Sequence, residues 1–113
     1  VSLEKFPTPQ ELELIENTSH VTQFATKMED FAETAALCSA LDAVIAVDTS
    51  TAHLSASVGV NTHLLIRDCA DWRWFQNRSN TPWYDSMTLH RKMAKTSWGE
   101  LLEMAVADIT QNN

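Results

Sequence analysis

The sequence has few basic residues, only two cysteines and no long hydrophobic run. Eight Lys and Arg stand against 15 Asp and Glu, which gives a formal net charge of −7. Because this charge repels polyanions, we expect neither nucleic acid nor an anionic membrane surface as a partner. No apolar run approaches the roughly 20 residues of a membrane span, and the N-terminus lacks a basic region followed by an apolar one. We therefore predict a cytoplasmic protein that does not span a membrane.

The two cysteines, Cys38 and Cys69, are far apart, and neither has a CxxC partner. Cys38 also falls within a helical apolar pattern. These features predict free thiols in a reducing compartment and argue against a disulfide framework. We expect no metal site.

The length of 113 residues fits a single domain spanning residues 1–113. The first residue is Val1, and VSLE predicts a strand or strand end with nothing before it to explain its apolar start. We therefore expect a fragment whose natural chain continues on the N-terminal side.

The stretch 42–58, DAVIAVDTSTAHLSASV, contains the clearest structural pattern of the chain. Residues 43–47 form a continuous apolar run rich in β-branched side chains, which predicts a parallel strand buried on both faces. Residues 51–58 are rich in Ala and Ser and predict a helix packed closely on the sheet. The chain would then pass from the carboxyl end of a strand directly into a helix N-terminus.

Three small polar residues, Asp48, Thr49 and Ser50, occupy this strand-to-helix junction. A helix N-terminus presents free backbone N–H groups and a positive dipole end, which suit a phosphate or pyrophosphate. In open α/β sheets, ligands bind outside the carboxyl ends of the strands. The same residues are equally typical of a helix cap and a turn, and a single histidine such as His53 is more often packed than ligating. The spacing alone leaves both interpretations open.

The rest of the chain alternates predicted strands and helices, which favours a βαβ unit with a right-handed crossover. Strands are expected at residues 1–3, 21–25, 62–66 and 87–90, helices at 31–41 and 97–109, and no more than a helical turn at 10–16. Asp30 with Glu33 and Ser97 with Glu100 form capping boxes, and Gly59 is a C-cap. The last helix is expected to pack through one face made of Leu101, Leu102, Ala105, Val106 and Ile109.

Residues 67–85 are rich in Trp and Arg and have no sustained period. A segment of this length inside a small domain either carries a function or is held by its own aromatic packing. Aromatic side chains that fill the edge of the sheet and aromatic side chains that stack on a ligand are equally compatible with the sequence.

Three stretches together resemble a known family: DFAETAALCSALDAVIAVDTSTAHLSASVG at 30–59, DWRW with SNTPWY between 71 and 84, and SWGELLEMAVADI at 97–109. From residue 30 onward the chain resembles the C-terminal lobe of a GT-B glycosyltransferase. It is most similar to the ADP-heptose:lipopolysaccharide heptosyltransferase-like superfamily (glycosyltransferase family 9), in the form found at the C-terminus of bacterial tetratricopeptide-repeat proteins. The resemblance implies an α/β fold: a Rossmann-like half of a GT-B fold, with a small parallel sheet flanked by helices.

The resemblance also implies a site for a nucleotide diphosphate sugar, the donor of a hexosyl or heptosyl group, with no cofactor or required metal. In the family, an Asp-Thr-small-x-x-His turn lies at the diphosphate. Carried over by position, Asp48 would face the donor sugar as the catalytic residue, and the substrate-binding residues around the phosphates would be Thr49, Ser50, Thr51, Ala52 and His53. Asp30, Phe31 and Thr34 would lie near the nucleoside.

The chain departs from the family pattern in two places. Val60, Asn61 and Thr62 follow Gly59 where the family generally has Gly-Lys/Thr-Pro, and His63 interrupts the next apolar run. The N-terminal lobe that binds the acceptor has no counterpart in these 113 residues. Because GT-B transfer takes place between two lobes, this chain is expected to bind donor, with the acceptor lobe as a partner, and not to transfer sugar alone.

Two other interpretations remain. A degenerate lobe would keep the fold and serve association, through the tryptophan-rich segment or as a homodimer. A flavodoxin-like or receiver module ranks last, because receivers need an acidic pair near an early strand and a Lys at a late one. The sequence does not identify the base, the sugar or the acceptor.

Overall fold

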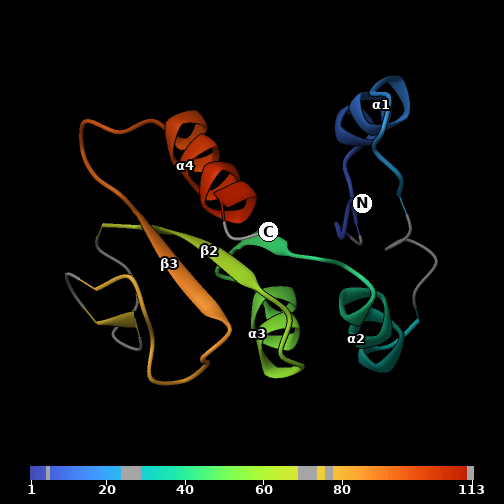
Figure 1. Cartoon of the computed structure of the whole chain (residues 1–113). Helices are drawn as coiled ribbons and strands as arrows, with labels where there is room; N and C mark the ends of the chain where they lie inside the picture. The colour runs from blue at the N-terminus through green and yellow to red at the C-terminus, as the bar shows by residue number, and fades with distance from the viewer. Residues whose placement is uncertain (5, 24–28, 69–73, 76–77, 112–113) are drawn as a thin grey trace.

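The computed structural model describes residues 1–4, 6–23, 29–68, 74–75 and 78–111. Along the chain it forms α1 (Pro9–Asn17), α2 (Phe31–Ser39), β1 (Val44–Val47), α3 (Ser50–Ser57), β2 (Thr62–Arg67), β3 (Met87–Lys92) and α4 (Trp98–Gln111), as shown in Figure 1. Within the described residues, every helix lacks either the length or the apolar character that crossing a membrane requires.

The three strands form one parallel sheet in the order β1-β2-β3. Residues Thr62 to Ile66 of β2 are all buried, because β2 has a strand on each side and a helix on each face. The predicted α/β fold with a small parallel sheet flanked by helices is therefore confirmed. The prediction that residues 43–47 are buried on both faces is wrong, since β1 lies at the edge of the described sheet and Val47 is 52% exposed.

Helix α3 covers one face of the sheet and α4 covers the other (Figure 1). The α3 side holds the larger core, made of Ala52, Ala56, Leu64, Ile66, Trp74, Met87 and Leu89. The α4 side holds a smaller core of Leu65, Leu101 and Ala105, against which Ile45 packs. The alternation of side chains along β2 places Leu64 and Ile66 in the α3 core and Leu65 in the α4 core.

Helix α4 begins with the predicted capping box. The Glu100 N–H donates to the Ser97 hydroxyl at 3.1 Å, and the Ser97 N–H donates to the Glu100 carboxylate at 3.2 Å. The expected apolar face is wrong in part, because Leu102 and Val106 are exposed. The small sheet is covered by a narrow stripe of the helix, and Leu101 and Ala105 fill that stripe.

The N-terminal segment differs most from the sequence-based expectation. Where only a helical turn was predicted, α1 is a complete helix with a capping box between Thr8 and Glu11 and with Pro9 at its first position. None of its residues is buried, and its clearest sequence signal is the capping box itself. The predicted strands 1–3 and 21–25 are reduced to one parallel bridge between Ser2 and Gln23, and residues 24 and 25 lie outside the described part.

The turn between α3 and β2 contains Gly59 in a left-handed conformation, with φ of 83°. Its N–H donates to the Ala56 carbonyl at 3.1 Å, which ends the helix as predicted. The free thiol of Cys38 is buried beside Val44 and Val60, and burial raises its pKa, as expected for an unreactive packed cysteine. Cys69 lies outside the described residues.

Two histidines interrupt the apolar residues beneath α4. His63 of β2 is 1% exposed and His90 of β3 is half-buried. Burial lowers the pKa of His63 against an opposing effect of Asp108, and burial together with His63 lowers the pKa of His90. Both imidazoles are therefore neutral near pH 7.

Candidate functional site

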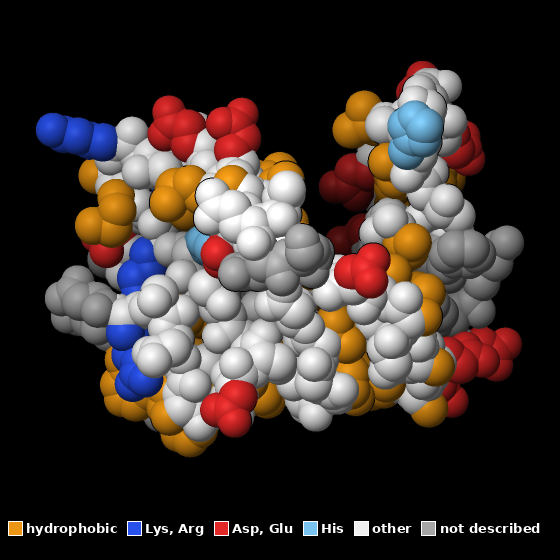
Figure 2. All heavy atoms as spheres, in the orientation of Figure 1, with side chains coloured by type: hydrophobic (Ala, Val, Ile, Leu, Met, Phe, Trp, Pro, Cys, Tyr) orange, Lys and Arg blue, Asp and Glu red, His pale blue; other side chains and the backbone are white. Residues whose placement is uncertain are grey.

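A cleft of about 810 Å³ opens at the carboxyl end of β1. It lies between the N-terminal segment and the first turns of α2 and α3, and Figure 2 shows the surface hollowed between α4 and the segment that carries α1. Its lining consists of Leu3, Glu4, Phe6, Glu29, Asp30, Phe31, Thr34, Ile45, Ala46, Val47, Thr49, Ser50 and Thr51. Six of the predicted site residues thus meet at one cleft: Asp30, Phe31, Thr34, Thr49, Ser50 and Thr51.

The first turn of α2 forms one wall of the cleft. The Asp30 carboxylate accepts from the Glu33 N–H at 2.9 Å, and the Thr34 hydroxyl donates to the Asp30 carbonyl at 3.2 Å. Glu33 completes the cap differently from the predicted box, because its carboxylate accepts from the Glu29 N–H. These bonds fix the end of the helix, and the ring of Phe31 remains 67% exposed beside the cleft.

The first turn of α3 forms a second wall of the cleft. Thr49 is the N-cap, but its side chain makes no capping hydrogen bond, because its hydroxyl donates to the Val47 carbonyl at 3.2 Å. The first N–H groups of an α-helix have no partner within the helix, so here they depend on something other than the cap side chain. Ser50 and Thr51 follow on the lining, while Ala52 is fully buried in the α3 core and is not among the lining residues.

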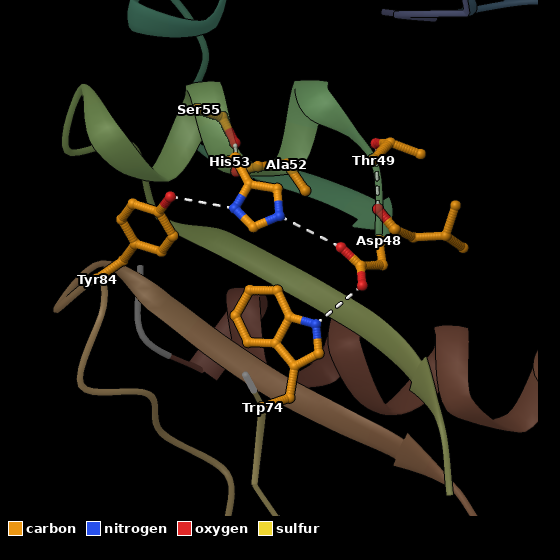
Figure 3. Close-up of polar contacts among 8 residues, drawn as sticks. Asp48, Thr49, Ala52, His53, Ser55, Trp74 and Tyr84 are labelled. Atoms are coloured by element: carbon orange, nitrogen blue, oxygen red, sulfur yellow. Dashed lines mark hydrogen bonds and ion pairs between the residues drawn. The ribbon is translucent and has the colours of Figure 1, made fainter. Parts of the chain in front are cut away.

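Asp48 and His53 do not line the cleft but contact each other, Trp74 and Tyr84, as Figure 3 shows. The Asp48 carboxylate accepts from Trp74 Nε1 at 2.9 Å through one oxygen and contacts His53 Nε2 at 3.3 Å through the other. His53 Nδ1 lies 3.1 Å from the Tyr84 hydroxyl. Since a carboxylate only accepts, His53 Nε2 is the donor toward Asp48, and in the tautomer with that single proton Nδ1 accepts from the Tyr84 hydroxyl.

Aromatic packing reinforces this arrangement. The rings of His53 and Trp74 stack with centroids 5.3 Å apart, and Trp74 is fully buried. The Arg91 guanidinium donates to the Trp74 and Phe75 carbonyls, which ties the tryptophan segment to β3. Asp48 and His53 therefore hold the turn between β1 and α3 against Trp74, and neither residue is part of the cleft lining.

For part of the tryptophan-rich segment, the structure shows the packing role, one of the two that the sequence left open. Trp74 packs in the core, whereas Phe75 and Trp83 stack on each other at the surface with centroids 6.5 Å apart. Trp72 lies outside the described residues.

The cleft carries negative charge. Glu4, Glu29 and Asp30 are among its lining residues, and none of the described lining residues is Lys or Arg. Figure 2 shows Lys and Arg side chains gathered along the side of the molecule that carries β3. A phosphate in this cleft would consequently depend on backbone N–H groups and hydroxyls.

Sequence reasoning missed the contributions of Leu3, Glu4 and Phe6 to the cleft and the pairing of Trp74 and Tyr84 with the junction. The aromatic segment was an evident feature of the sequence, but no pattern in it indicates which ring reaches Asp48. Asp48 and Trp74 are 26 positions apart in the sequence, and His53 and Tyr84 are 31 positions apart. Only the fold brings these pairs into contact.

Comparison of the chain with protein-family models, with curated proteins and with solved structures found no match in any of the three. What the cleft binds is therefore inferred from its geometry and from the motifs of the sequence.

Proposed function

We propose that the cleft binds the nucleoside diphosphate part of a nucleotide sugar. One observation carries this proposal: the first turns of α2 and α3 line the same cleft at the carboxyl end of β1. In open α/β sheets this is where ligands bind, and helix N-termini favour anions there. The glycosyltransferase resemblance associates the same two segments with the nucleoside and the diphosphate.

The first turn of α3 serves as the diphosphate site. The Thr49 side chain leaves the N–H groups of this turn uncapped, and phosphate oxygens accept hydrogen bonds from such groups. The hydroxyls of Ser50 and Thr51 add donors on the same lining. Charge-assisted bonds of this kind compensate for the absence of a basic side chain among the described lining residues.

The first turn of α2 serves as the nucleoside site. The exposed ring of Phe31 offers a surface on which a base stacks, which contributes about 1–3 kcal/mol per base. The Asp30 carboxylate accepts from the Glu33 N–H and has further lone pairs for a ribose hydroxyl.

The proposal is donor binding and not sugar transfer. In the glycosyltransferases that the sequence resembles, transfer takes place between two lobes, and these residues correspond to one of them. Asp48 would act on the donor sugar only if its carboxylate exchanged its contacts with Trp74 and His53. Its proposed role in the chain alone is to fix the turn that carries the diphosphate site.

Isothermal titration with ADP, UDP and GDP tests this function, with two variants of the same residue. Ser50 is the first residue of α3 and follows an extended Thr49, so Ser50→Pro fits the helix while removing one N–H donor. We expect one of the three nucleotides to bind, and Ser50→Pro to weaken its binding roughly tenfold, as expected for a lost bond to a charged group. Ser50→Ala removes only the hydroxyl and should weaken binding less.

A second candidate function, association with a protein partner, is favoured by the exposed stack of Phe75 and Trp83. Two adjacent large aromatic side chains at the surface are typical of interface anchors. Absence of binding by all three nucleotides, in a sample that circular dichroism shows to be folded, would reject the donor site and favour this function.

A further inference from the structure

A cluster of three potential metal ligands lies beneath α4, apart from the cleft lining. His63 comes from β2, His90 from β3 and Asp108 from α4, which packs over these strands (Figure 1). His63 Nδ1 lies 2.9 Å from His90 Nε2 and 3.7 Å from the Asp108 carboxylate, and the ligand atoms of all three residues lie within 4.8 Å of one another.

From this geometry we infer that His63, His90 and Asp108 bind a divalent transition-metal ion of the zinc class. Zinc is held by imidazole nitrogens and carboxylate oxygens at about 2.0–2.2 Å, which places tetrahedral ligand atoms about 3.4 Å apart. The spacings of 2.9 Å from His63 Nδ1 to His90 Nε2 and 3.7 Å from His63 Nδ1 to the Asp108 carboxylate lie on either side of this value. Three protein ligands leave a further coordination position for water or another ligand.

Packing alone gives a poor explanation for this cluster. His63 is almost completely buried, and its Nε2 has no hydrogen-bond partner within the described part of the structure. A buried polar group without a partner costs about 1–3 kcal/mol, and an aliphatic residue on the same strand face would avoid that cost. What distinguishes His63 from an aliphatic residue is its other nitrogen, Nδ1, which faces His90 and Asp108.

The cluster is also accessible to an ion. The Asp108 side chain is 37% exposed at the rim, while His63 lies at the bottom, so an ion enters past the carboxylate and meets the two imidazoles. The expectation that the chain has no metal site considered only the two cysteines. Residues 63, 90 and 108 follow no metal-binding spacing in the sequence, and parallel pairing of β2 with β3 brings them together.

Titration of the metal-stripped chain with Zn²⁺ tests the inference. We expect one Zn²⁺ per chain. Loss of a residue that only supports a metal ligand typically weakens binding by roughly 10–100-fold. Asp108→Asn and His90→Gln change the ligands themselves, so each should weaken Zn²⁺ binding by at least that factor. His20→Gln is the matched control, because His20 is an exposed histidine outside the cluster. The thermal midpoint of the wild type should rise with Zn²⁺, and that of Asp108→Asn should rise less.

Zn²⁺ binding that is unchanged in Asp108→Asn and His90→Gln would overturn the inference and assign the ion to surface carboxylates. No binding to the folded wild type would overturn it equally. Because Asp108 lies at the rim, Asp108→Asn is expected to fold, and this variant decides the outcome even if His90→Gln does not fold.

Discussion

Replacement of Trp74 by alanine is expected to lower the free energy of unfolding by about 3–5 kcal/mol. Trp74 is fully buried in the α3 core, its indole N–H donates to Asp48, and its ring stacks on His53. The substitution removes the largest fully buried side chain among the described residues and leaves a cavity between the sheet and the turn that carries Asp48. Urea denaturation followed by far-UV circular dichroism measures the loss.

Trp83→Ala is the matched control, because Trp83 is 51% exposed and its removal opens no core cavity. We expect this variant to lose less than about 1 kcal/mol. Trp74→Phe keeps most of the apolar volume while removing the indole N–H, so it should fall between the two. Equal losses for Trp74→Ala and Trp83→Ala would contradict the placement of Trp74 in the core.

Leu101→Ala is expected to lower the free energy of unfolding by about 2–5 kcal/mol, because Leu101 anchors α4 to the sheet. Leu101 is 1% exposed and packs with Leu65 and Ala105, whereas the adjacent Leu102 is 44% exposed. Leu102→Ala should therefore cost less than about 1 kcal/mol. Thermal and urea unfolding of the two variants, which delete the same atoms from neighbouring positions, measures the difference.

If Leu102→Ala proved the more destabilising of the two, α4 would pack through the other side of its apolar face. That outcome would also remove Asp108 from its place beside His63, since both leucines and the aspartate belong to the same helix.

Regular elements with strong local signals were predicted well from the sequence. The apolar runs predicted the parallel strands, and the caps at Asp30 and Ser97 predicted where α2 and α4 begin. Gly59 predicted the end of α3 because the left-handed conformation there suits glycine. Each of these signals acts within a few residues, and for that reason single-sequence reasoning detects it.

Features that depend on distant residues were not predictable in the same way. Helix α1 is an exception, because it was missed although its signal, the capping box of Thr8 and Glu11 with Pro9 between them, is local. The edge position of β1 is decided by which strands pair, and a hydrophobic run does not contain that information. The same holds for the bond from Trp74 to Asp48 and for the contact of His63 with His90.

For the candidate site, the sequence predicted the two segments that form the walls. It did not predict which of their side chains line the cleft and which pack against the aromatic residues. Asp30, Thr34, Thr49, Ser50 and Thr51 line the cleft, whereas Asp48 and His53 face Trp74 and Tyr84. The division follows from geometry, because the chain turns sharply between the end of β1 and the start of α3. Neighbouring residues of the same motif therefore lie on different sides of the turn, some at the cleft and some against the aromatic side chains.

The most direct test of the proposed diphosphate site is a two-dimensional ¹H–¹⁵N NMR titration of the chain with ADP, UDP and GDP. The largest amide shift changes should fall on Ser50, Thr51 and Ala52 in the first turn of α3, with a second group at residues 30–34. The amides around Phe75 and Trp83 should remain unchanged. Saturating nucleotide that leaves the first turn of α3 unshifted, or that shifts only residues outside the cleft lining, would contradict nucleoside diphosphate binding at this cleft.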